Sequence, residues 1–125
     1  MNRKVTVLIV DNRGQLKLAH DILEQERVNI LTADSGEEAL NVLESTDADL
    51  VISAVQLSGM SGSELLHEIR EWDRELPVIL VGISKESSDG IESHAFALLP
   101  QRYRKDSLLK VVHRALDAKE SLTYP

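Results

Sequence analysis

The sequence contains no cysteine, and aromatic residues make up only 3% of its 125 residues. Without cysteine the chain forms no disulfide, performs no thiolate chemistry and binds no zinc through sulfur. It also lacks any apolar run of the length that a membrane span requires. The apolar stretch near the N-terminus stops after Val10 at Asp11, which is too early for a signal peptide. These absences predict a cytoplasmic protein that does not bind a membrane.

The chain is acidic rather than basic. Asp and Glu number 21 against 14 Lys and Arg, which gives a formal net charge of -7 at pH 7. Nucleic-acid binding depends on clustered Lys and Arg that neutralise phosphates, so this balance argues against direct nucleic-acid contact. The length matches the usual size of one domain with one core. We expect a single domain over residues 1–120, followed by a tail at residues 121–125.

Five short apolar runs alternate with helical patterns along the chain. The runs cover residues 5–10, 28–33, 50–55, 78–81 and 96–99. Several are nearly continuous in Val, Ile and Leu, which is typical of parallel strands covered on both faces. The alternation of strand and helix predicts an α/β fold with a doubly wound five-stranded parallel sheet and helices on both faces.

Two helix starts are marked by capping-box spacing. Ser35 stands three residues before Glu38, and Ser61 stands three residues before Glu64. In this motif the serine side chain accepts a hydrogen bond from an otherwise unpaired amide at the helix start. We expect the second and third helices to begin at these serines. Trp72 continues the apolar stripe of the third helix, so we expect it to pack against the sheet or to cap the helix end, in the core or at its margin.

The end of the chain carries one more helical pattern. It follows Asp106 and directs one apolar stripe inward, formed by Leu108, Leu109, Val112, Ala115 and Leu116. The segment before the fifth strand, residues 84–90, is polar and contains glycine. This composition predicts that a helix between the fourth and fifth strands is short or absent.

Ligands of open parallel sheets bind beyond the carboxyl ends of the strands. For the strand order 2-1-3-4-5 the binding crevice lies between strands one and three. The residues at the strand ends are Asp11 and Asn12, then Ala54, Gly82 and Gln101. We expect them to converge at one edge of the sheet.

Four segments carry a resemblance to a known family: VLIVDN (residues 7–12), DLVISA (49–54), SGMSG (58–62) and PVIL (77–80). They resemble the landmarks of response-regulator receiver domains, the CheY-like family, and the match covers essentially the whole chain. The resemblance implies the flavodoxin-like strand order 2-1-3-4-5. It also implies a role in two-component, or phosphorelay, signal transduction.

The resemblance assigns a family role to each strand-end position. Receivers hold Mg²⁺ with an acidic pair after strand one, and an Asp that ends strand three accepts a phosphoryl group. A Thr or Ser ends strand four, and a Lys follows strand five. Here the acidic pair becomes Asp11 and Asn12, the phosphoacceptor position falls on Ala54, the hydroxyl position on Gly82 and the Lys position on Gln101. Only Asp11 keeps the family's chemistry.

These substitutions remove the groups that phosphoryl transfer requires. The reaction needs a nucleophilic carboxylate and cations that neutralise the charge on the transferred oxygens. The methyl group of Ala54 forms no acyl phosphate, and Asp11 alone should hold Mg²⁺ weakly. We therefore expect a pseudo-receiver with a degenerate phosphorylation site, no enzymatic activity, no cofactor and no metal. It would act as a phosphorylation-independent protein-protein interaction module for a histidine kinase, an output domain or another regulator.

Other interpretations of these residues remain open. A small-ligand sensor could reuse the vacated strand-end pocket, with amide donors from Asn12 and Gln101. Ala54 could be an engineered replacement of Asp, although Asn12, Gly82 and Gln101 also depart from the family pattern. Asp11 is equally well explained as a residue that caps the turn after the first strand.

The last strand and helix form a locally basic region in this acidic chain. The candidate partner-binding residues are Arg102, Tyr103, Arg104, Lys110 and Arg114. Basic charges on a helix are also typical of an ordinary solvated face. The resemblance implies that this region contacts partners or forms a homodimer through the last strand and helix.

The histidines do not form a metal-binding pattern. His20, His67, His94 and His113 lie on different predicted elements, and no two have the i, i+4 spacing of a helical metal pair. We expect all four to be solvated surface residues.

Overall fold

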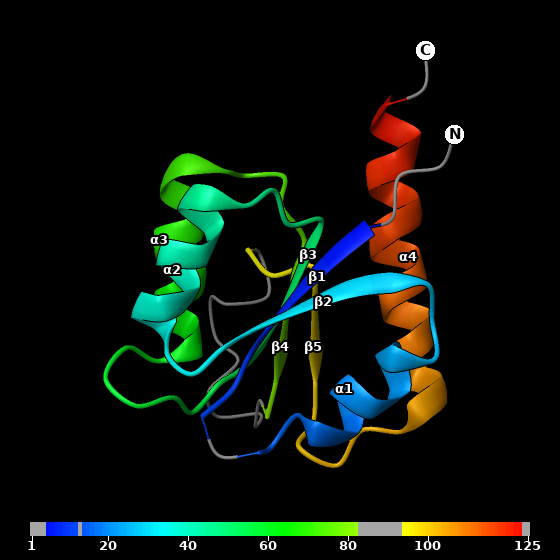
Figure 1. Cartoon of the computed structure of the whole chain (residues 1–125), viewed down its shortest axis with the longest axis horizontal. Helices are drawn as coiled ribbons and strands as arrows, with labels where there is room; N and C mark the ends of the chain where they lie inside the picture. Colours follow the sequence, from blue (N-terminus) through cyan, green and yellow to red (C-terminus); the bar gives the residue numbers. More distant parts are fainter. Residues whose placement is uncertain (1–4, 13, 83–93, 124–125) are drawn as a thin grey trace.

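The computed structural model describes residues 5–12, 14–82 and 94–123, with side chains through residue 117. Its described part contains one five-stranded parallel sheet in the order β2-β1-β3-β4-β5 (Figure 1). The strands are β1 (Val5–Val10), β2 (Val28–Ala33), β3 (Leu50–Ala54), β4 (Val78–Val81) and β5 (Ala97–Leu99). The predicted doubly wound α/β fold and its strand order are confirmed.

Helices cover both faces of the sheet (Figure 1). α1 (Lys17–Glu24) and α4 (Lys105–Thr123) lie on one face, and α2 (Gly36–Ser45) and α3 (Gly62–Trp72) lie on the other. α4 begins one residue before Asp106 and continues to Thr123, so residues 121–123 of the predicted tail are helical. The expected short helix between β4 and β5 falls on residues 83–93, outside the described residues.

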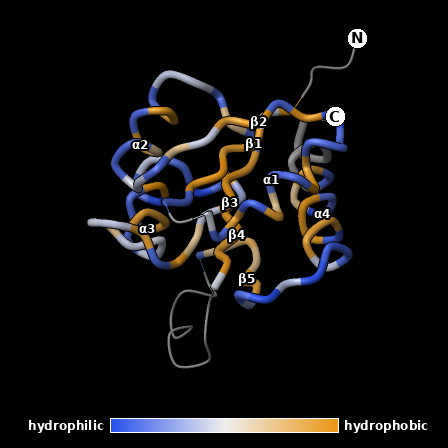
Figure 2. The backbone as a smooth tube through the Cα atoms, turned by 60° about the horizontal axis from the view of Figure 1, so that its bottom comes forward, coloured by the Kyte–Doolittle hydropathy of each residue, from blue (hydrophilic) through white to orange (hydrophobic). Residues whose placement is uncertain are grey.

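Alternating strand residues face two separate cores. Val7 and Ile9 pack on the side of α1 and α4, whereas Leu8 and Val10 pack on the side of α2 and α3. Successive strand side chains point to opposite faces, so a run of apolar residues serves both cores at once. The apolar strands therefore run through the middle of the molecule, between the helices (Figure 2). None of the described helices is both apolar and long enough to traverse a bilayer.

Both predicted helix starts are confirmed. The Ser35 hydroxyl accepts a hydrogen bond from the Glu38 amide at 3.1 Å, and the Ser61 hydroxyl accepts one from the Glu64 amide at 3.1 Å. At Ser61 the box is complete, because the Glu64 carboxylate accepts from the Ser61 amide at 3.3 Å. These bonds satisfy amides that the first turn of a helix leaves unpaired.

Trp72 is the last residue of α3 and lies outside the core, which contradicts packing against the sheet and leaves the alternative position at the margin of the helix end. Its side chain is 53% exposed, although Ile69 one turn earlier is fully buried. The chain turns immediately after the helix, where the Asp73 carboxylate accepts hydrogen bonds from the amides of Glu75 and Leu76 at 2.9 and 3.0 Å. This turn directs Leu76, which is 4% exposed, into the core, and Trp72 remains at the surface.

Tyr103 is also placed differently from its predicted surface position. It is 8% exposed and belongs to the core between the sheet and the α1 and α4 helices. Its hydroxyl oxygen is buried without a hydrogen-bond partner of normal geometry among the described residues. Burial raises the pKa of Tyr103, and the nearby Ala19 backbone offsets only part of that effect. The phenol therefore anchors the β5–α4 loop and presents no contact surface.

We expect Tyr103→Phe to keep or raise the free energy of unfolding, by up to about 1 kcal/mol, because it removes an unpaired buried hydroxyl. The pKa of Tyr103 in the fold is raised above its ordinary value of 10.0, so the unfolded chain loses the phenol proton first. The stabilisation is present below that ordinary value and is lost as pH rises through the raised pKa. Denaturant unfolding at about pH 8 and about pH 11 should show a smaller alkaline loss in Tyr103→Phe.

The reference is the unmodified protein, which keeps the buried phenol over the same pH range. An equal alkaline loss in Tyr103→Phe and in the unmodified protein would contradict the burial argument.

Gly62 allows α3 to start directly against β3. A Cβ at this position would lie 2.3 Å from the carbonyl oxygen of Ala54 and 2.9 Å from the Cα of Val55, both of which are backbone atoms. We expect Gly62→Ala to lower the free energy of unfolding by about 1–3 kcal/mol, because the helix must shift to make room. Thermal or denaturant unfolding measures the loss.

Gly36→Ala is a matched control, since Gly36 is likewise the first residue of a helix after a capping serine. A Cβ there would meet only the Met60 side chain, with the sulfur at 2.8 Å. A flexible side chain moves more cheaply than backbone, so the loss should be clearly smaller. Equal losses in the two variants would refute the close-approach argument.

Candidate functional site

The register of the sheet brings the predicted strand-end positions into one row. Val10 lies beside Ser53, Ala54 beside Val81, and Val81 beside Leu99. The residues that follow these strands therefore emerge at the same edge. The structure places Asp11, Ala54 and Gly82 in that row, with Gln101 exposed just beyond β5. The predicted convergence of these positions is observed.

Asp11 is engaged with the turn that leads into α1. Its carboxylate accepts a hydrogen bond from the amide of Leu16, the N-cap residue of α1, at 2.8 Å. Its own amide donates to the Ala33 carbonyl at 3.0 Å, which extends the β1–β2 pairing by one residue. This geometry matches the interpretation of Asp11 as a turn cap.

Asn12 connects two loops at the strand ends. Its amide nitrogen donates to the hydroxyl of Ser58 in the β3–α3 loop. Gln15 adds a second, longer contact between the same loops, donating to the Gln56 carbonyl at 3.4 Å. The carbonyl oxygen of the Asn12 side chain is buried and has no hydrogen-bond partner among the described residues. Sequence reasoning missed this connection, because it joins residues 46 positions apart.

Ala54 places a methyl group at the end of β3. The residue is fully buried and packs in the core on the side of α1 and α4. Its carbonyl oxygen accepts a hydrogen bond from the Ser53 hydroxyl at 2.8 Å. A methyl group carries no nucleophilic oxygen, so no acyl phosphate forms on this side chain.

Gly82 follows β4 in a backbone conformation that suits glycine. Its φ is +103°, in the region that residues with a Cβ rarely adopt. The conformation is held by the Gly82 amide, which donates to the Leu99 carbonyl at 2.9 Å. A Thr or Ser at this position would be strained unless the backbone moved.

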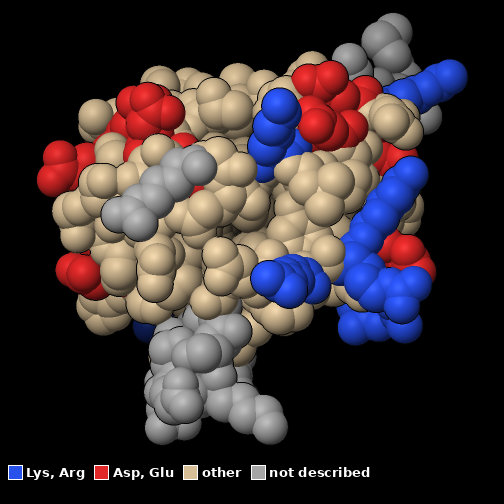
Figure 3. Space-filling view, turned by 90° about the horizontal axis from the view of Figure 1, so that it is seen from below, with Lys and Arg blue, Asp and Glu red and all other residues tan. Residues whose placement is uncertain are grey.

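The carboxyl-end face of the sheet carries its charge at the margins. Viewed from that face, Lys and Arg gather on the side of α4, whereas the middle shows mostly uncharged residues (Figure 3). Arg102 and Arg104 are exposed on either side of the buried Tyr103, and Lys110 and Arg114 are exposed one turn apart on α4. The Arg104–Asp106 ion pair is 3.8 Å long with both side chains more than 80% exposed, so it contributes little to stability.

Among the described residues, the only group of three potential metal ligands is His20, Asp21 and Glu24, whose ligand atoms lie within 4.8 Å of one another. Asp11 is not part of it. The three side chains lie on one exposed turn of α1, an arrangement that is common without an ion. These three residues therefore do not replace the Mg²⁺ site that the family has at the strand ends.

The histidines pair with carboxylates near the surface. His20 contacts Glu24 at 3.0 Å, and His67 contacts Glu71 at 3.3 Å, each within one helix. The His113 ring nitrogen lies 2.9 Å from a Glu26 carboxylate oxygen and links α4 to the chain after α1. The last contact is long-range, so no helical spacing in the sequence could reveal it.

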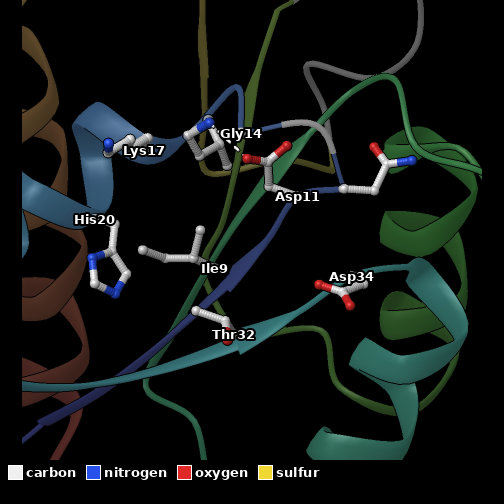
Figure 4. Close-up of a pocket in the computed structure, with 9 residues that line it drawn as sticks. Ile9, Asp11, Gly14, Lys17, His20, Thr32 and Asp34 are labelled. Atoms are coloured by element: carbon white, nitrogen blue, oxygen red, sulfur yellow. Dashed lines mark hydrogen bonds between the residues drawn. The ribbon is translucent and has the colours of Figure 1, made fainter.

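A hollow of about 330 Å³ opens beside the predicted site rather than in it. It lies between α1 and the carboxyl ends of β1 and β2 (Figure 4). Asp11 and Asn12 contribute to its lining, but Ala54, Gly82 and Gln101 do not. The only sequence signal of this hollow is Gly14, in the turn before α1, whose φ is +72°.

Comparison with known proteins agrees with this geometry. A family model described as the response regulator receiver domain matches residues 7–113. The chain is 32% identical over 120 residues to the transcriptional regulatory protein GlrR of Escherichia coli. It is also 32% identical over 116 residues to the autoinducer 1 sensor kinase/phosphatase LuxN of Vibrio campbellii. These matches cover 94% and 92% of this chain, but only 27% of GlrR and 13% of LuxN.

Solved structures give the same result. The response regulator protein TrrA of Thermotoga maritima, in complex with Mg(2+)-BeF, superposes with a TM-score of 0.82 at 32% identity, covering 90% of this chain and 99% of that one. The signal receiver domain of an HD domain-containing protein of Pseudomonas fluorescens superposes with a TM-score of 0.86 at 25% identity, covering 97% and 93%. The chain thus belongs to the response regulator receiver domain family, the CheY-like modules of two-component signalling.

Proposed function

We propose that this receiver domain signals by binding a protein partner and that phosphorylation plays no part in its activity. The observation that carries the proposal is the methyl group of Ala54 at the end of β3, where the family's chemistry needs a carboxylate. Gln101 supplies no ammonium to pair with a phosphoryl group. The domain therefore works without enzymatic activity, cofactor or metal, and we assign it to the cytoplasm.

The contact between Asn12 and Ser58 supports a fixed conformation of the strand-end loops. In a phosphorylatable receiver, Mg²⁺ connects the acidic pair after strand one to the Asp that ends strand three. Here a hydrogen bond between two neutral side chains joins the same two loops. Such a bond does not depend on metal or phosphate, so the loops keep one arrangement whether or not a kinase is active.

The exposed basic residues of the β5–α4 region favour an acidic partner surface. Arg102, Arg104, Lys110 and Arg114 project from a protein whose formal net charge is -7. Opposite charge on a partner would steer association and fix its orientation. GlrR and LuxN are, by their names, a transcriptional regulator and a sensor kinase, and each matches this chain over a small part of its length. These two relatives support a histidine kinase, an output domain or another regulator as the partner. A homodimer of this chain would also form through the last strand and helix.

We expect acetyl phosphate with Mg²⁺ to leave the mass of the intact protein unchanged, because no carboxylate stands at position 54. We also expect no saturable amide shifts at Asp11, Ala54, Gly82 or Gln101 when Mg²⁺ and then beryllofluoride are added. Beryllofluoride mimics a phosphoryl group on a carboxylate. Intact-mass spectrometry and amide correlation spectra make the two measurements.

TrrA is the positive control for the beryllofluoride titration, since its structure was solved with Mg(2+)-BeF. Phosphorylation of any residue of this chain would contradict the proposal. So would saturable shifts at the strand ends that match those of TrrA.

The partner surface is tested by charge reversal on α4 and the loop before it. A photoreactive residue at the exposed position Ser107 should cross-link a partner in cells of the source organism. Replacing Arg104 and Lys110 together by Glu should lower the yield about tenfold, given about 0.7 kcal/mol lost for each of the two exposed charge pairs. Higher salt should also lower the cross-linking yield of the protein without the Glu replacements in lysate, because salt screens exposed charges.

Arg74→Glu is the matched control, because Arg74 is exposed and follows α3 on the other side of the sheet. It should leave the yield unchanged. No adduct from position 107, or equal losses in the Arg74 and Arg104/Lys110 variants, would count against this surface.

A further inference from the structure

The hollow beside α1 adjoins the strand-end site, because Asp11 and Asn12 line it whereas Ala54, Gly82 and Gln101 do not. It has a volume of about 330 Å³ and opens on the α1 side of the sheet, toward β2 at its edge. Pockets of about 300 Å³ and above are large enough for small metabolites. Neither Ala54 nor any of the candidate partner-binding residues lines it.

The hollow has an apolar floor and a polar rim. Ile9 and Leu16, both core residues, form the floor. Asp11 lies at one end, but its carboxylate already accepts the Leu16 amide. The His20 ring nitrogen Nδ1 is paired with Glu24 at 3.0 Å. These groups shape the walls and are already engaged with the protein.

Two charged groups on the rim have no polar partner within the part of the chain that the structure describes. The Lys17 ammonium and the Asp34 carboxylate form no hydrogen bond or ion pair with any described residue. They lie on opposite sides of Ile9, with Lys17 on α1 and Asp34 just after β2 (Figure 4). Thr32 adds a hydroxyl on the β2 wall. A cation and an anion thus face one cavity across an apolar floor.

We propose that this hollow binds a small zwitterion, a molecule with a carboxylate and an amine joined by a short aliphatic spacer. The carboxylate pairs with Lys17, the amine pairs with Asp34, and the spacer lies over Ile9. Either charge alone would gain little at such an exposed site, since single exposed ion pairs are weak. Two ion pairs made by one ligand share a single cost in translational and rotational freedom, so the site selects molecules with both charges.

This inference is independent of the proposed function. The zwitterion site uses Lys17 and Asp34, whereas the proposed function depends on Ala54 and on the exposed basic residues of the β5–α4 region. Failure of the ligand titration would leave the phosphorylation and cross-linking results intact. Failure of the phosphorylation or cross-linking tests would likewise leave the result of the ligand titration intact.

The test is an amide-shift titration of labelled protein with glycine, β-alanine, γ-aminobutyrate and ε-aminocaproate, which differ in spacer length. At least one should give saturable shifts at Gly14, Thr32 and Asp34, with a dissociation constant on the order of 1 mM. Butyrate and butylamine, which each carry one of the two charges, should bind about tenfold more weakly than γ-aminobutyrate. No saturation by any of the four zwitterions below about 50 mM would overturn the proposal. Equal binding of the single-charge molecules would overturn it too.

Single substitutions test the contribution of each of the two charges to ligand binding. Lys17→Met and Asp34→Asn should each weaken the best zwitterion at least about fivefold and leave the spectrum otherwise unchanged. Lys105→Met and Asp47→Asn remove exposed charges that do not line the hollow, and both should keep full affinity. Retained affinity in Lys17→Met or Asp34→Asn, or equal loss in the controls, would assign the shifts to a different site.

Discussion

The arrangement of the strand-end region depends on the contact between the start of α3 and the end of β3. Gly62 lies so close to the strand that a Cβ would meet the Ala54 carbonyl oxygen at 2.3 Å, and its amide donates to the Val55 carbonyl at 2.8 Å. The loop of residues 55–61 therefore returns to the end of β3, where it began. This loop carries Ser58, which accepts a hydrogen bond from Asn12, and Ser61, which caps α3. The lack of a Cβ at Gly62 thus lets the β3–α3 loop approach the loop after β1.

The receiver framework of this chain is stabilised mainly by apolar packing on both faces of the sheet. Two apolar cores cover the sheet, one against α1 and α4 and the other against α2 and α3. Apolar burial of this kind is the main favourable term in folding and needs no charged site. Carboxylates crowded at a metal site repel one another when the metal is absent. With Asn12 and Ala54 in place of acidic residues, Asp11 is the one carboxylate left from the family's set, so this repulsion does not arise.

The carboxyl-end face divides into two sides with different chemistry. On the α4 side, Tyr103 is buried and holds the β5–α4 loop, so its neighbours Arg102 and Arg104 are directed into solvent. On the β2 side, the hollow lies between α1 and the carboxyl ends of β1 and β2, with Lys17 and Asp34 on its rim. The neutral middle, around Ala54, separates them. A macromolecule and a small molecule could occupy the two sides without sharing a residue.

The sequence by itself determined the order and type of the elements, the two serine-capped helix starts and the absence of a carboxylate at position 54. These features depend on residue identity or on the spacing of near neighbours, such as the three residues between Ser61 and Glu64. Only the tertiary structure decided that Tyr103 is buried, that Trp72 is exposed, that Asn12 bonds Ser58 and that Gly82 adopts a positive φ. Each of these depends on which distant segments pack together, and a periodic pattern carries no information about a partner 46 residues away.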